Sequence, residues 1–280
     1  IENGAAAAVA FGRASDHASK TASGEELLVD AYPAIGAAYA GDASAAATIM
    51  SDVLPRAVEA GDATVEALAT LWVAAGKIDT GDLDDAIAGL DRAMSMAATG
   101  QLHPFYAGMV ACGVVSYCRY MGDWDRAKQW NAAADRLCER ESICHFPGHC
   151  AVFRSEIQWL EGDVEGAAKS AREALELAGD WSTAWTGLAH HEIGEAELCL
   201  GNLSAAQTAF AHAVEAGQSP QPGRARLLAA SGDDAAAIDS LRQSLNEPGG
   251  PGAADRILVL SAGVTLAIGA NELGQAKAWG

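Results

Sequence analysis

Side chains able to ligate zinc gather in one stretch near the middle of the chain. Cys144, His145, His149 and Cys150 lie close together, and Cys138 precedes them. Thiolates and imidazoles are common zinc ligands, and a loop between helices could bring four of them together. However, the spacing C-x5-C-H-x3-H-C matches no common structural zinc pattern, and the Phe-Pro-Gly between the histidines is typical of a turn. We therefore predict packed cysteines around a turn, with no metal and no cofactor. Metal binding or redox switching of the Cys144–Cys150 cluster is the alternative.

A second group combines His190 and His191 with Glu192 and Glu195. A zinc-protease helix needs histidines at positions i and i+4, whereas these two are adjacent and point to different sides of a helix. We expect instead a His191–Glu195 contact on a helix surface. The chain also has no phosphate loop of the form G-x-x-x-x-G-K-[ST] and no evident Ser/His/Asp arrangement. The sequence therefore predicts a protein that is not an enzyme.

Aromatic side chains cluster in the middle of the chain and could line a groove. They are Phe105, Tyr106, Tyr117, Tyr120, Trp124, Trp130, Phe146, Phe153, Trp159, Trp181 and Trp185. Aromatic rings can stack on a ligand or a partner peptide, and arginine can pair with a carboxylate. The alternative is that the rings fill gaps between alanine-lined helices. We choose five residues as the candidate binding site: Tyr106, Arg119, Arg154, Trp185 and Glu192.

The elements that must position these residues recur along the chain. A glycine precedes an acidic or amide residue, and an alanine stands five positions after the glycine. The copies are Gly41-Asp42…Ala46, Gly81-Asp82…Ala86, Gly122-Asp123…Ala127, Gly162-Asp163…Ala167, Gly201-Asn202…Ala206, Gly232-Asp233…Ala237 and a degenerate Asn271-Glu272…Ala276. The steps between copies are 40, 41, 40, 39, 31 and 39 residues, a period typical of helical-hairpin solenoids. The glycine can end one helix, the next residue can cap the following helix, and the alanine predicts a tight helix crossing.

The pattern predicts an all-α fold, a right-handed α-solenoid of about seven TPR-like helical hairpins. We expect residues 1–22 to form a lead-in segment and residues 23–280 to form a single continuous array whose last repeat is truncated. Because the chain starts at Ile1 and stops within a hairpin, we expect a longer parent chain. The first helix of each hairpin is expected at residues 24–40, 62–79, 104–121, 148–161, 181–200, 222–231 and 254–269.

Charge and composition limit the kinds of partner that the chain is expected to bind. The formal net charge is −19, from 37 acidic and 18 basic residues, so the surface repels phosphate backbones and we predict no direct nucleic acid binding. The acidity serves solubility or, alternatively, favours a basic partner. Most of the six cysteines fall at apolar helical positions, which suits a reduced, cytoplasmic protein. No apolar run is long enough to span a membrane.

Several segments resemble the helical-repeat region of actinobacterial LuxR-type transcriptional regulators over about residues 80–250. They are Leu90–Met94, Pro104–Met109, Ala127–Trp130, Leu137–Arg140, Phe146–Cys150, Phe153–Glu156, Ile193–Glu195, Leu198–Leu203 and Gln218–Gly223. Related repeat regions occur in multidomain ATPase–cyclase regulators. The resemblance implies a TPR-like sensory or interaction region that normally accompanies a C-terminal helix-turn-helix domain. No basic recognition helix of that kind stands in this sequence.

We therefore expect a non-catalytic regulatory module of a LuxR-like transcription regulator. It would bind a protein or peptide partner, or a small-molecule effector, through the concave face of the superhelix, and it could form a homo-oligomer. Two alternatives stay open. One is a stand-alone TPR scaffold for protein–protein interaction, and the other is a regulatory segment of a multidomain signalling enzyme such as a cyclase.

Overall fold

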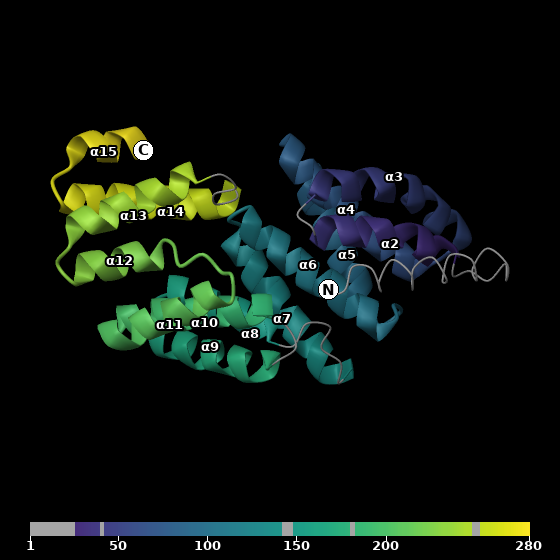
Figure 1. Ribbon diagram of the computed structural model, residues 1–280. Coiled ribbons are helices and arrows are strands. Elements are labelled where there is room, and N and C mark those ends of the chain that lie inside the picture. The colour runs from purple at the N-terminus through teal and green to yellow at the C-terminus, as the bar shows by residue number, and fades with distance from the viewer. Residues whose placement is uncertain (1–25, 40–41, 142–147, 180–182, 248–252) are drawn as a thin grey trace. The chain divides into compact units, whose positions relative to one another are not determined.

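A computed structural model describes residues 26–39, 42–141, 148–179, 183–247 and 253–280, which form fourteen helices and no strand (Figure 1). The helices are α2 (Glu26–Tyr39), α3 (Ala43–Ala60), α4 (Ala63–Thr80), α5 (Leu83–Ala98), α6 (Pro104–Tyr120), α7 (Trp124–Glu141), α8 (His149–Leu160), α9 (Val164–Ala178), α10 (Thr183–Cys199), α11 (Leu203–Glu215), α12 (Gly223–Ala230), α13 (Asp234–Asn246), α14 (Ala253–Gly269) and α15 (Leu273–Trp279). The expected lead-in segment lies outside the described residues.

The predicted hairpins are confirmed. Each even-numbered helix is the first helix of a hairpin, and its bounds lie within two residues of the predicted range. The single short repeat step also has a structural cause, because α12 is only 8 residues long. The fold is therefore the all-α solenoid that the glycine period predicts.

The turn between the two helices of a hairpin has one recurring geometry. Gly81, Gly122, Gly162, Gly201 and Gly232 all take positive φ angles, between 73° and 88°. The residue after the glycine donates its backbone N–H to the carbonyl five residues earlier, as in Asp163 N to Gln158 O at 2.9 Å. This bond satisfies a carbonyl at the helix C-terminus. In the degenerate copy Asn271 takes the glycine's place with φ 62°, which asparagine tolerates better than most residues.

The capping role of the next residue is confirmed only in part. The carboxylates of Asp42, Asp163 and Asp233 each accept a hydrogen bond from a backbone N–H in the first turn of the following helix. Asp82 and Asn202 occupy the same position without such a bond. The Asn202 amide instead donates to a Glu197 carboxylate oxygen at 2.8 Å.

The alanine five positions after the glycine, which we call the crossing alanine, is buried in every hairpin. Its exposed fraction is 0–1% in the first six copies and 8% at Ala276. A larger side chain at this position would push the two helices apart, because interiors are packed too tightly to absorb extra methylene groups. The burial of the seven alanines agrees with a tight helix crossing at this position, and the crossing itself stays a prediction.

Two compact units make up the chain. The first unit contains residues 1–119 and 125–145, and the second contains residues 120–124 and 146–280. The expectation of a single continuous array over residues 23–280 stays a prediction.

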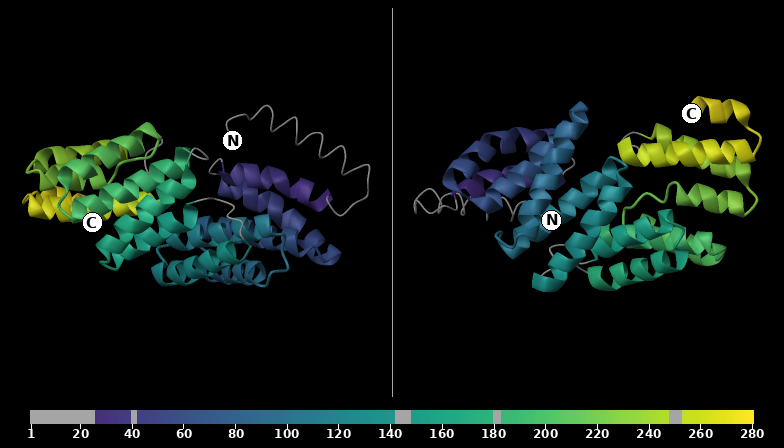
Figure 2. Two further views of the ribbon diagram at one scale, coloured as in Figure 1. Left: turned by 90° about the horizontal axis from the view of Figure 1, so that it is seen from below. Right: turned by 180° about the vertical axis from the view of Figure 1, so that it is seen from behind.

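Consecutive helices pack against one another from α2 to α5 in the first unit and from α8 to α15 in the second (Figure 2). In the first unit α2 also contacts α4, and the centre of the Trp72 ring on α4 lies 6.0 Å from that of the Tyr117 ring on α6. In the second unit α8 contacts α10, α10 contacts α12, and α12 contacts α14. The first helices of neighbouring hairpins therefore lie side by side and form one layer, which we call the first-helix layer of that unit. None of the described helices is both long and apolar enough to cross a membrane.

Candidate binding surface on the first helices

All five predicted site residues lie on first helices. Tyr106 and Arg119 lie on α6 in the first unit, whereas Arg154 on α8 and both Trp185 and Glu192 on α10 belong to the second unit. The five are therefore divided between two first-helix layers. Their role in binding stays a prediction, and their surroundings differ considerably.

In the first unit, Tyr106 belongs to a group of partly exposed rings. The ring centre of Phe105 lies 5.2 Å from that of Tyr106, and the ring centre of His103 lies 5.8 Å from it, both in edge-to-face geometry. Burial raises the pKa of the Tyr106 phenol, and the nearby Tyr32 phenol on α2 raises it further. Tyr32 is 51% exposed and Phe105 is 40% exposed. We call Tyr32, His103, Phe105 and Tyr106 the aromatic patch.

Sequence reasoning selected only Tyr106 from this patch. Tyr32 and Tyr106 are 74 residues apart in the chain, and only the fold brings the two phenols near enough to influence each other. Tyr32 could have been found from the sequence as a large aromatic residue on a predicted first helix. It was missed because it lies outside the central cluster of aromatics. Arg119 is half-buried near the end of α6.

In the second unit, the rings pack inward. The His149 ring centre lies 4.3 Å from Phe153 and 4.2 Å from Trp185, and His149 is only 2% exposed. Trp185 is half-buried. This arrangement agrees with the gap-filling interpretation of the aromatics at this position, since Trp185 covers a buried imidazole.

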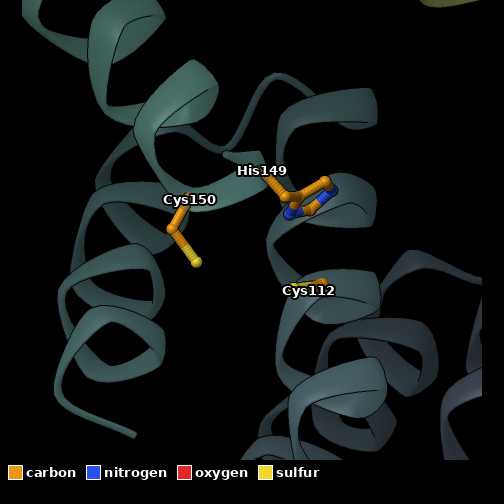
Figure 3. Close-up of side chains that lie close together, drawn as sticks. All are labelled: Cys112, His149 and Cys150. Carbon is orange, nitrogen blue, oxygen red and sulfur yellow. The ribbon is translucent and has the colours of Figure 1, made fainter. Parts of the chain in front are cut away.

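His149 and Cys150 also belong to the stretch considered for zinc. Figure 3 shows both side chains projecting from the first turn of α8, and it also labels Cys112 on α6 of the first unit. Cys150 is 6% exposed, as expected for a packed cysteine. Cys144 and His145 lie outside the described residues, so metal or redox chemistry of the Cys144–Cys150 cluster stays an untested alternative.

Charged residues form a buried network across three first helices of the second unit. Glu195 on α10 is 4% exposed and accepts two hydrogen bonds from Arg226 on α12, at 3.1 and 3.0 Å. The Arg226 guanidinium also lies 5.2 Å from the centre of the Trp159 ring on α8. Such a paired arrangement offsets the desolvation of a buried carboxylate. We call Glu156, His191, Glu192, Glu195 and Arg226 the charged network.

A glycine lets α12 come close enough for this pairing. A Cβ added to Gly223 would lie 2.7 Å from Glu195 Oε1 and 2.3 Å from Phe210 Cζ, closer than real Cβ atoms approach. Gly223, the first residue of α12, therefore allows the close approach that lets Arg226 reach Glu195.

His191 lies among the carboxylates of the network. Its Nδ1 is 3.4 Å from Glu192 Oε1, and its Nε2 is 4.0 Å from Glu195 Oε1. Burial lowers the pKa of His191, but the hydrogen bond to Glu192 and the charges of Glu192, Glu195 and Glu156 together raise it above the ordinary value. When it is protonated, the imidazole can act as a counter-ion for several glutamates.

The expected surface position of the His191–Glu195 contact was wrong. The side chains are only 14% and 6% exposed. The contact faces inward because Arg226 from α12 covers the carboxylate. Helical spacing within α10 cannot reveal that Arg226 lies there. Glu192, chosen for a groove, is likewise 7% exposed and belongs to this network.

Arg154 is engaged within its own hairpin. Its Nε donates to Ser170 Oγ at 3.2 Å, and its guanidinium pairs with a Glu173 carboxylate oxygen at 2.8 Å, both on α9. An acidic partner group would have to compete with Glu173 for this arginine.

Comparisons with known proteins identify the fold. No protein-family model matches the chain, and no curated protein matches it. Among solved structures, it is similar to a chain of the APC/C hetero-tetramer Cut9–Hcn1, with a TM-score of 0.61 and 17% identity over 90% of this chain. The match spans 44% of that longer chain. It is also similar to a thermophilic TPR protein of Thermus thermophilus, with a TM-score of 0.50 and 17% identity over 73% of this chain and 98% of that one. At this identity the likeness shows a TPR-like fold.

Proposed function

We propose that the protein is a non-catalytic binding and regulatory module that holds a protein or peptide partner on the first-helix layer. The observation that carries this proposal is the aromatic patch, because Tyr32 and Phe105 are 51% and 40% exposed on first helices of the same unit. Exposed aromatic rings supply large contact areas at little entropic cost, and they are enriched at binding hot spots.

The charge of the chain favours a basic partner. With a formal net charge of −19, the molecule attracts lysine- and arginine-rich segments and steers them to its surface. Guanidinium groups also stack on aromatic faces, so an arginine beside an apolar residue is the segment that the patch would hold. Arg119, Arg154, Trp185 and Glu192 are proposed as secondary contacts, with Arg154 and Glu192 less accessible because of their internal partners.

The cellular setting of this proposal rests on the sequence resemblance. We place the module in a cytoplasmic LuxR-type transcription regulator, where capture of a partner or effector alters the packing of neighbouring hairpins and thereby an output domain. Repeat arrays suit this role because each hairpin contacts only its neighbours, so small shifts accumulate without loss of the core.

A peptide selection tests the proposal. The full chain is screened against a displayed random-peptide library, and a fluorescein-labelled selected peptide is then titrated with each variant by fluorescence anisotropy. We expect basic, aromatic-containing peptides, and an affinity loss of about tenfold or more for the Phe105→Ala/Tyr106→Ala double variant, as for hot-spot residues.

Leu83→Ala is the matched control, because Leu83 is 47% exposed but lies on α5, a second helix. Its affinity should equal that of the wild type. Selected peptides that bind the double variant as tightly as the wild type would contradict the proposal.

A further inference from the structure

An open groove runs between the two helices of the α10–α11 hairpin in the second unit. Its volume is about 710 Å³, and it is lined by apolar residues such as Ile193, by the hydroxyls of Ser204 and Thr208, and by two histidines. His190 comes from α10 and His212 from α11. One wall of the groove is therefore a second helix, so it is distinct from the aromatic patch.

The two imidazoles face the same space. Their ring centres are 4.9 Å apart, and their planes are inclined by 62°. In the part of the chain that the structure describes, neither imidazole forms a hydrogen bond or an ion pair. His212 is exposed and His190 is half-buried. Two basic side chains thus share one opening without a protein group that binds them.

This spacing is compatible with a metal ion shared by the two imidazoles. Zinc binds imidazole nitrogen at about 2.0–2.1 Å, so two imidazoles on one tetrahedral ion have ring centres roughly 5 Å apart. The spacing also suits nickel and copper, for which imidazole is a good ligand. The groove leaves room for water or another donor in the remaining coordination positions.

An acidic side chain also stands close to the two imidazoles. Glu215 follows His212 by three residues, on the same side of α11, and adds negative charge near the site.

We propose that His190 and His212 form a binding site for a divalent transition-metal ion, with its remaining positions open to the groove. This inference goes beyond the binding of a partner by the first helices. The open positions give the ion room for a donor atom from a ligand or a partner side chain, while the hydroxyls of Ser204 and Thr208 can hydrogen-bond to metal-bound water.

Nickel titration of the full, tag-free chain in the presence of a phosphine reductant tests the site. Isothermal calorimetry measures the affinity and stoichiometry for the wild type, His190→Gln, His212→Ala and the control His103→Ala. Removing a residue that hydrogen-bonds to a metal ligand weakens metal binding about 10–100-fold. Removing one of the two ligands should therefore lower the nickel affinity at least about tenfold. His103→Ala changes an exposed histidine of the first unit and should bind nickel like the wild type.

A second measurement separates this site from the cysteines. In the NMR spectrum of the imidazole nitrogens, substoichiometric Ni²⁺ should broaden the His190 and His212 signals first. His212 is exposed, so His212→Ala should retain the wild-type circular dichroism spectrum and melting temperature without metal. A wild-type chain that binds no nickel would overturn the proposal. It would also be overturned if His212→Ala bound nickel with unchanged affinity.

Discussion

The first helices of the two units occupy the same place in the hairpin but carry different chemistry. Six residues before the turn glycine, the first unit has Ile35, Ala75 and Ser116, whereas the second unit has Glu156, Glu195 and Arg226. The turns and crossing alanines are the same in both units. The hairpin geometry therefore depends on the glycine and alanine positions, and the first-helix positions are free to specialise.

The difference has a consequence for binding. In the second unit, charges on consecutive first helices satisfy one another, and Arg154 is occupied by Glu173. In the first unit, Tyr32 and Phe105 keep much of their surface exposed. We therefore propose that the charged network stabilises the second unit and that the aromatic patch of the first unit binds the partner.

Removing Glu195 should produce the largest change in stability. Glu195→Ala leaves Arg226 without its carboxylate partner and His191 with one fewer counter-ion. Breaking a buried pair in this way costs about 3–5 kcal/mol, and the partial exposure of Arg226 places the expected loss near the lower end. Urea denaturation monitored by circular dichroism measures it.

The exposed Glu176 on α9 provides the control for this prediction. Glu176→Ala should change the unfolding free energy by no more than about 0.5 kcal/mol. If both variants unfolded at the same urea concentration, the charged network would not stabilise the second unit.

Enlarging a crossing alanine should affect both units alike. Ala86→Leu in the first unit and Ala167→Leu in the second each place a larger side chain where the exposed fraction is 0%. Overpacking of this kind costs about 1–3 kcal/mol. Ala88→Leu is the control, because Ala88 lies on the same helix as Ala86 but is exposed. Equal melting temperatures for Ala86→Leu and Ala88→Leu would refute the shared crossing.

The contribution of His191 should depend on pH. Its pKa is raised above 6.5 in the folded chain, so its stabilising effect is fully present below pH 6.5 and is lost as the pH rises through the folded pKa. The unfolding free energy of the wild type should therefore exceed that of His191→Gln most at about pH 6, and the difference should shrink towards about pH 9. A difference that stays constant or grows with pH would show that His191 does not act as the counter-ion of the network.

The sequence predicts those features of the fold that residues close together in the chain determine. Helix bounds, turn glycines and crossing alanines depend on local backbone preferences, which is why α4 and α10 begin and end within two residues of expectation. The pairing of Glu195 with Arg226 was missed, although both stand six residues before a turn glycine and thus in register on adjacent first helices.

The site was harder to predict than the fold. Whether an aromatic ring is exposed depends on neighbours from other hairpins. Trp185 packs on His149, whereas Tyr32 stays open to solvent, and neither outcome follows from helical periodicity alone. Comparing the residues that stand six positions before the turn glycine in successive repeats would have grouped these charged residues.

Photo-crosslinking tests the central assignment most directly. A selected peptide carrying a photoreactive phenylalanine is irradiated with the full chain, and mass spectrometry locates the modified residues. We expect the crosslinks on α2 and α6, centred on Tyr32 and Phe105, and loss of these crosslinks in the Phe105→Ala/Tyr106→Ala variant. Crosslinks confined to the second helices α3, α5 and α7 would contradict the assignment of binding to the first helices.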